Sequence, residues 1–229
     1  MQNISLNGNQ LKIIAITAML IDHIGAVFYP DLAILRAIGR LTMPIMAYFI
    51  AEGYHYTQDL NRYMLRLLAF GIITMVPYSL YFGFGPFNVM FSLLAGLIAI
   101  TLYDRYESST KKMLAVFLPM LVATFLGFDG QFIVVFLVFI FHRYRGQFQM
   151  AAIHMLLLYA MVEAMFVMSN ITGDGPVGFH MWIQLFALLT LPLLYKYNGT
   201  KGKPELPKYT FYIFYPLHIS LLLLVKLYI

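Results

Sequence analysis

The segment LKIIAITAMLIDHIGAVFYP, residues 11–30, decides the fold class. It is almost entirely apolar, and about 20 residues of α-helix are enough to cross the hydrocarbon core of a bilayer. Inside lipid the backbone has to satisfy its own hydrogen bonds, which an α-helix does without a partner segment. The segment therefore predicts a transmembrane helix near the N-terminus.

The composition extends this prediction to the whole chain. Hydrophobic residues make up 61% of its 229 residues, charged residues make up 11%, and the mean hydropathy is +0.77. Soluble domains average roughly 45–50% apolar and about 25% charged residues, so a water-soluble fold could not cover this much apolar surface. We predict an all-α, multi-pass protein of the inner (plasma) membrane of the cell, with residues 1–229 forming a single transmembrane domain.

Charge and cysteine content exclude several classes of function. The formal charge is +5, but Lys and Arg lie in short gaps between apolar runs, which is typical of a cytoplasmic membrane face and not of a nucleic-acid interface. Cysteine is absent, which excludes disulfides and thiolate chemistry, and no metal-ligand spacing is found, so we expect no metal. Residues 1–10 lack the basic region and cleavage site of a signal peptide, so we expect the first helix to be retained.

Apolar runs separated by polar residues predict a bundle of about nine transmembrane helices, each needing ~20 residues to span the bilayer. The fifth and sixth runs are short and could be half-helices around Gly127 and Gly130. The predicted helices are residues 10–29, 32–54, 63–82, 86–103, 113–126, 130–141, 149–169, 179–197 and 209–227.

The charge of the connections predicts the orientation. The connections at residues 30–31, 83–85, 128–129 and 170–178 contain no Lys or Arg, whereas the alternate connections are basic. Basic loops of membrane proteins face the cytoplasm, so we predict a cytoplasmic N-terminus and, with nine crossings, an external C-terminus. The basic residues of the alternate connections are Arg62, Arg105, Lys111, Lys112, Arg143, Arg145, Lys196, Lys201, Lys203 and Lys208.

Ionisable side chains inside a membrane helix cost ~2.5–3.5 kcal/mol each on insertion scales, so they are candidate site residues. Lys12 lies near the start of the first predicted helix, and His23 follows eleven residues later. At ~1.5 Å per residue the two are roughly 16 Å apart along the axis, and nearly three full turns place them on one face. Neutral imidazole is suited to general-base catalysis, although an intramembrane His is about as often a hydrogen bond between helices.

Asp22 and Arg40 are predicted to pair, because they lie at similar depth in the hairpin of the first two helices. Arg36 and Arg40 are four residues apart and therefore share a face of the second helix. The pair could be structural, fixing two helices to each other, or it could serve a functional site. Both interpretations stay open.

Four further polar residues have a less specific context. Glu52 lies near the cytoplasmic end of the second helix, and His55 is close enough to the interface to be explained by snorkelling. Residues 215–218 are expected to interrupt the last helix, with Pro216 forming a kink that brings His218 into the bilayer. The aromatic run before His218 could equally be an interfacial belt. Glu163 lies near the middle of the seventh helix.

Six stretches of the sequence resemble, in order, the TraX family of membrane proteins. They are LKIIAITAMLIDHIGAVFYP, LRAIGRLTMPIMAYFIAEGYHYT, NRYMLRLLAF, NVMFSLLAGL, LLYKYNGTKG and KYTFYIFYPLHISLLLL. The family is named for the protein that acetylates the N-terminus of conjugative pilin. It is similar in pattern to the acyltransferase-3 superfamily, in which a basic residue, ten residues and a His open the first helix. Here the pattern is Lys12, ten residues and His23, with Lys where the superfamily usually has Arg.

The resemblance implies a membrane-embedded acetyltransferase that moves an acetyl group from cytoplasmic acetyl-CoA to an amine or hydroxyl acceptor, such as a pilin or other peptide N-terminus or a surface glycan. It implies that His23 is the general base or carries the acetyl group itself, with Asp22 or Arg40 orienting it and stabilising the developing charge. The residues expected to bind acetyl-CoA are Lys12, Arg36, Glu52 and His218.

Two other functions stay open. One is a small-molecule or ion transporter that uses Asp22, Arg40 and Glu163 as a relay, although transporters usually show paired halves with broken helices, and the sequence has no such symmetry. The other is a non-catalytic pilus or envelope assembly protein, which CoA would not stabilise.

Overall fold

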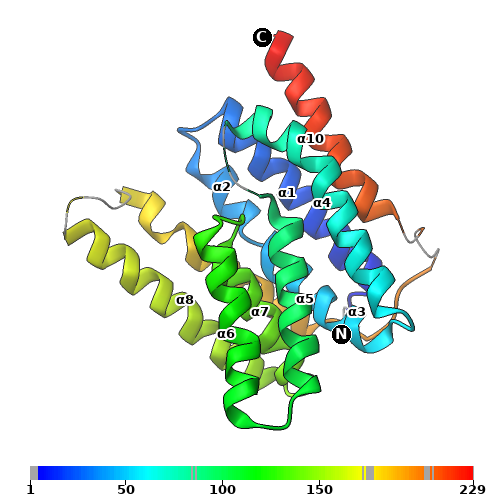
Figure 1. The fold of residues 1–229 in the computed structure, drawn as a ribbon. Helices are drawn as coiled ribbons and strands as arrows, with labels where there is room; N and C mark the ends of the chain where they lie inside the picture. Colours follow the sequence, from blue (N-terminus) through cyan, green and yellow to red (C-terminus); the bar gives the residue numbers. More distant parts are fainter. Residues whose placement is uncertain are drawn as a thin grey trace. The chain divides into compact units, whose positions relative to one another are not determined.

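A computed structural model of the chain describes residues 5–83, 85, 87–171, 173, 178–203, 207 and 209–228. These residues are mostly helical (Figure 1). The single β-type pairing among the described residues is an isolated parallel bridge between Leu6 and Tyr197. The helices are α1 Gly8–Phe28, α2 Ala33–Gly39, α3 Thr42–Tyr56, α4 Leu60–Phe82, α5 Val89–Arg105, α6 Ser109–Phe125, α7 Gln131–Arg143, α8 Phe148–Ile171, the 3₁₀ helix η1 Gly178–Leu189, α9 Thr190–Tyr195 and α10 Thr210–Tyr228.

The nine predicted runs each correspond to a helical segment of the described residues. Two runs are divided: the second forms α2 and α3, and the eighth forms η1 and α9. Each division falls just before a proline, Pro44 or Pro192, because proline has no N–H and its ring clashes with the carbonyl four residues earlier. Pro86, where the fourth run was predicted to begin, and Lys208 lie outside the described residues.

Five helical segments are long and apolar enough to cross a membrane, namely α1, the joined α2 and α3, α4, α8 and α10. α6 and α7 are two separate helices joined at Gly127 and Gly130, which both have positive φ, so these glycines form a turn between helices. The described residues are therefore helical, and five of their segments could span a membrane by length and composition. Nine crossings and a cytoplasmic N-terminus stay predictions.

The chain divides into two compact units. The first unit contains Met1–Ile45 and Gly146–Lys208, and in it α2 packs against α1 and η1, while η1 packs against α8 and α9. The second unit contains Met46–Arg145 and Tyr209–Ile229. The prediction of a single domain over residues 1–229 stays a prediction.

The start of α1 is tied to the segment that follows α9. Asn7 caps α1 through a capping box with Gln10, which satisfies two backbone amide groups at the helix start. Further amide groups donate to carbonyls of residues 196–201, and we call residues 6–9 and 196–201 the N-terminal clamp. Its bonds run from Leu6 N to Lys196 O (2.8 Å), Asn198 N to Leu6 O (2.9 Å), Gly8 N to Thr200 O (2.7 Å) and Asn9 N to Lys201 O (2.9 Å).

α5 is the central helix of the second unit. It packs against α4, α6 and α7, and α10 lies along α4 (Figure 1). The close approach of α5 to α7 requires a glycine at position 96, because a Cβ there would lie 2.8 Å from Cγ2 of the fully buried Val138. Small side chains, among them Ala95 and Ala99, continue this tight contact.

Gly96→Ala is therefore expected to destabilise the protein by about 1–3 kcal/mol, the usual cost of overpacking a tight core. Thermal unfolding of the detergent-purified protein, followed by the intrinsic fluorescence of its aromatic residues, measures this. Gly85→Ala is the matched control, because the nearest atom to a Cβ there is 3.7 Å away. Equal melting temperatures for the two variants would contradict the packing argument.

Candidate functional site

In the first unit, the carboxylate of Asp22 on α1 is held by two guanidinium groups from α2 and its C-cap. Arg36 Nη1 lies 2.7 Å from Oδ2 of Asp22, and Arg40 Nη2 lies 2.9 Å from Oδ1. Arg36 Nη1 also donates to the backbone carbonyl of Asp22 at 3.1 Å, and Arg40 Nε donates to the carbonyl of Arg36 at 3.1 Å. The predicted Asp22–Arg40 pair is confirmed, and Arg36 completes a three-residue charge cluster.

The local sequence explains how both arginines reach the Asp22 carboxylate. Arg36 and Arg40 are one helical turn apart, so both reach the same side of α2. Gly39 lies between them against Asp22, and a Cβ at this position would overlap the carboxylate. The side chains of Asp22 and Arg40 are each 13% exposed, so the ion pair is shielded from solvent and holds α1 and α2 together.

His23 follows Asp22 directly and is 7% exposed. α1 is continuous from Gly8 to Phe28, so the predicted separation of Lys12 and His23, roughly 16 Å at 1.5 Å per residue, applies to one unbroken helix. A buried imidazole in a helix that also holds a shielded ion pair can accept a proton, provided that a substrate reaches it.

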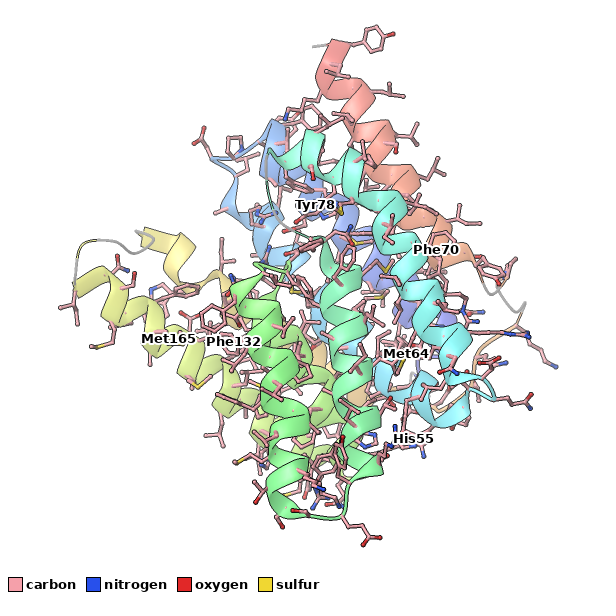
Figure 2. All side chains as sticks on the ribbon, in the orientation of Figure 1. His55, Met64, Phe70, Tyr78, Phe132 and Met165 are labelled. Carbon is pink, nitrogen blue, oxygen red and sulfur yellow. The ribbon has the colours of Figure 1, made fainter. Side chains whose placement is uncertain are left out.

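The second unit contains a cluster that we did not select from the sequence. His142 on α7 is 8% exposed, its Nδ1 lies 3.2 Å from Nε2 of His55 on α3, and its Nε2 lies 3.1 Å from Oδ1 of Asp104 on α5. Tyr54 donates its hydroxyl to the other oxygen of Asp104 at 3.0 Å. The two imidazole rings stack with centroids 5.1 Å apart. We call His55, His142 and Asp104 the His–His–Asp cluster; His55 is labelled in Figure 2.

A second contact between α3 and the end of α7 lies beside this cluster. Arg145 donates to both carboxylate oxygens of Glu52, at 2.8 and 3.4 Å, and to the hydroxyl of Tyr56 at 3.1 Å. The hydrogen bond that Arg145 donates to Glu52 raises the pKa of Arg145 above its ordinary value. Glu52 is thus paired with an arginine.

The comparisons with known proteins agree with the sequence resemblance. The family model described as "TraX protein" matches residues 7–226. The chain belongs to the TraX family. It is 31% identical to the "Probable fimbrial assembly protein FimC, serogroup H1" of Dichelobacter nodosus, with 100% of this chain and 99% of that protein covered. It is also 36% identical to the "Uncharacterized protein RP591" of Rickettsia prowazekii (strain Madrid E), over 38% of this chain and 33% of that protein.

No solved structure matches this TraX-family chain. The family resemblance stated from the sequence is confirmed by the match to the TraX model. The wider link to the acyltransferase-3 superfamily stays a prediction.

The predicted site residues of this TraX-family chain fall in both units. The first unit holds the three predicted catalytic residues together with Lys12 and Arg36, whereas Glu52 and His218 belong to the second unit. His218 is 4% exposed, and its ring stacks on Phe214 at 4.6 Å. The expected interruption at residues 215–218 is wrong: α10 runs from Thr210 to Tyr228 through Pro216, because a helix can continue past the loss of one backbone hydrogen bond.

One apolar pocket of the second unit is not lined by any predicted site residue. It has a volume of about 610 Å³ and lies between α5 and α6, where nearly all of its lining is apolar and Lys111 is at one end. Tyr106 and Lys111 are its titratable residues, and its described lining holds no His, Asp or Glu. In the described residues, no group of three or more His, Asp or Glu side chains is arranged to hold a metal ion.

The His–His–Asp cluster was missed because its members are far apart in the sequence. His55 was attributed to snorkelling, and His142 was not considered. One signal was available: Glu52 and His55 are three residues apart on α3, and His142 and Arg145 are three apart at the end of α7, so two matched pairs can meet.

Asp22→Asn is expected to destabilise the protein by about 3 kcal/mol, because it leaves two arginines without a counter-charge in a shielded position. The matched control is Asp59→Asn, which alters the exposed Asp59–Arg62 pair and keeps a side chain that can cap α4, so its cost should stay below about 1 kcal/mol. Chemical or thermal unfolding in detergent measures both. Equal stabilities would show that the Asp22 cluster is dispensable for folding.

Proposed function

We propose that this TraX-family chain is a membrane-embedded acetyltransferase that moves an acetyl group from cytoplasmic acetyl-CoA to an amine or hydroxyl acceptor. The observation that carries the proposal is the buried His23, placed eleven residues after Lys12 on one unbroken helix. This is the basic residue and His pattern by which the sequence resembles acyltransferase-3 proteins. A pilin or other peptide N-terminus, or a surface glycan, is the acceptor class that the resemblance implies.

His23 acts as the general base in this proposal. A neutral imidazole takes the proton from the acceptor amine or hydroxyl as that group attacks the thioester carbonyl. The carbon–sulfur bond then breaks, and the CoA thiolate leaves and takes up a proton. Lys12 contributes positive charge for the CoA phosphates, and the pantetheine arm extends across the roughly 16 Å to His23.

The contacts of Asp22, Arg36 and Arg40 favour a positioning role over the catalytic and CoA-binding roles expected from the sequence. Because both guanidinium groups already bind the Asp22 carboxylate, we assign these residues to hold the α1–α2 hairpin and so fix the depth of His23. They are positioning residues for the proposed reaction. Glu52 and His218 are weaker candidates for binding acetyl-CoA, since Glu52 is negatively charged and paired with Arg145.

A second candidate function is a non-catalytic role in fimbrial or pilus assembly. The observation that favours it is the similarity over the full chain to a protein named as a probable fimbrial assembly protein. Such a role needs no acetyl donor. Binding of CoA therefore discriminates between the two candidates.

His23→Gln is expected to lower acetyl-CoA turnover at least about 100-fold, the usual minimum contribution of a general base. The assay measures release of free CoA by the purified protein in the presence of an amine acceptor. His154→Gln is the matched control, because His154 is a partly exposed histidine of α8 in the same unit. Turnover that survives in His23→Gln would refute the assignment of His23.

Lys12→Met is expected to weaken CoA binding roughly tenfold, since one phosphate contact with a cation is lost. Lys12→Arg keeps the charge and should retain binding. Thermal stabilisation of the protein by CoA, compared with an unrelated nucleotide, measures this because a ligand that binds the folded state raises the melting temperature. No stabilisation of the wild type by CoA would favour the assembly role.

A further inference from the structure

In the second unit, His55, Asp104 and His142 bring three helix ends together. Each is the last residue but one of its helix, in α3, α5 and α7 respectively. The C-terminal end of a helix carries a partial negative charge from its unsatisfied carbonyl groups, and this charge stabilises a nearby cation. The carboxylate of Asp104 adds to this effect. The three helix ends and the Asp104 carboxylate therefore surround the His142 ring with hydrogen-bond acceptors.

The hydrogen bonds determine which ring nitrogens carry protons. An ionised carboxylate only accepts, so the Nε2 of His142, 3.1 Å from Asp104, must carry a hydrogen. In a neutral His142 the Nδ1 is then an acceptor, and the Nε2 of His55, 3.2 Å away, must donate to it. In a neutral His55 the remaining nitrogen, Nδ1, has a lone pair, and among the described residues it has no hydrogen-bond partner.

The two imidazole rings also differ in their exposure. His142 is buried against Tyr54 and Tyr103, whose rings lie edge to face with it at 5.2 and 6.4 Å. His55 is exposed at the end of α3 (Figure 2). A reagent can therefore reach His55, while His142 is held in one orientation by its neighbours.

This arrangement has the parts of a nucleophilic triad: a nucleophile within hydrogen-bond reach of a base, and the base oriented by a third group. We propose that His55, His142 and Asp104 form such a triad, in which His55 is the nucleophile toward an activated acyl donor, an ester or a thioester. The charges around His55 are mixed, because Glu52 is paired with Arg145 and Asp104 accepts from His142. A neutral acyl carbonyl needs no further counter-charge in such surroundings, so an acyl donor suits this region.

Nδ1 of His55 bonds to the carbonyl carbon of the donor, and the bond from that carbon to the leaving oxygen or sulfur breaks. The Nε2 proton of His55 passes to Nδ1 of His142, and the resulting imidazolium is stabilised by Asp104. The leaving alkoxide or thiolate then takes up that proton. Water or an amine finally attacks the acyl carbon, and the bond from that carbon to Nδ1 of His55 breaks. The proton that the water or amine loses returns through His142 to Nε2 of His55, which restores the neutral imidazole.

The triad lies wholly in the second unit, so it does not depend on the acetyl-CoA function proposed for His23. His55 is the catalytic residue, because its nitrogen meets the acyl carbon. His142 and Asp104 are positioning residues that act through it.

The test uses the purified full-length protein in lipid nanodiscs with p-nitrophenyl acetate, a neutral activated ester. Release of p-nitrophenolate is measured from acidic to alkaline pH, and the acetylated residue is identified by mass spectrometry after rapid mixing. His55→Gln is expected to remove the release that depends on the protein and the adduct at position 55. His142→Gln and Asp104→Asn should each lower the rate at least about tenfold.

Asp104→Glu keeps a carboxylate and should recover part of the rate that Asp104→Asn loses, because the base then keeps an anionic partner. If Asp104 were purely structural, the isosteric Asp104→Asn would stay closer to the wild type than Asp104→Glu. His154→Gln, the matched histidine control, should behave as the wild type.

The proposal is overturned if His55→Gln keeps the wild-type rate, if the adduct forms only at other residues, or if the wild type shows no release above buffer. Acetyl-CoA turnover is measured with the same preparations and with His23→Gln. A failure of the triad can then be told from a failure of the function proposed for His23. If the wild type turns over acetyl-CoA but does not cleave p-nitrophenyl acetate, the triad is overturned and the function of His23 stands. If the wild type cleaves the ester but does not turn over acetyl-CoA, the function of His23 is overturned and the triad stands.

Discussion

The structure depends on the need to satisfy every backbone amide and carbonyl within an apolar chain. With charged residues making up only 11% of the sequence, most segments cannot rely on water for their hydrogen bonds, and helices satisfy them internally. Polar side chains in such a chain have to find partners too. The Asp22 carboxylate with its two arginines shows one solution, in which opposite charges from α1 and α2 neutralise each other.

The two candidate sites satisfy their polar groups in different ways and differ in how exposed their histidines are. His23 is buried in the first unit, beside a charge cluster whose members already contact one another. His55 is exposed in the second unit, and its partners form a chain of hydrogen bonds that ends at Asp104. A buried base needs a ligand that penetrates the protein, whereas an exposed nucleophile needs only a donor that diffuses to it.

Local properties of the sequence predicted the helices well. The run predicted at residues 149–169 became α8, Phe148–Ile171, because length and apolar composition act within one segment. The Asp22–Arg40 pair was also predictable, since a short hairpin leaves two charges at similar depth few alternatives. The meeting of His55 with His142 was not, because these residues are 87 positions apart and their contact depends on how α3 and α7 pack. The break before Pro44 was missed because the apolar pattern continues across it.

The N-terminal clamp has a consequence for the order in which the protein is made. The carbonyl groups of residues 196–201 that receive the amide groups of residues 6–9 leave the ribosome long after those amides do. During synthesis the first turn of α1 therefore has only its own capping box, and the remaining donors must rely on water or lipid headgroups. Closure of the clamp is a late event in biogenesis, and a chain truncated before residue 196 would lack it entirely.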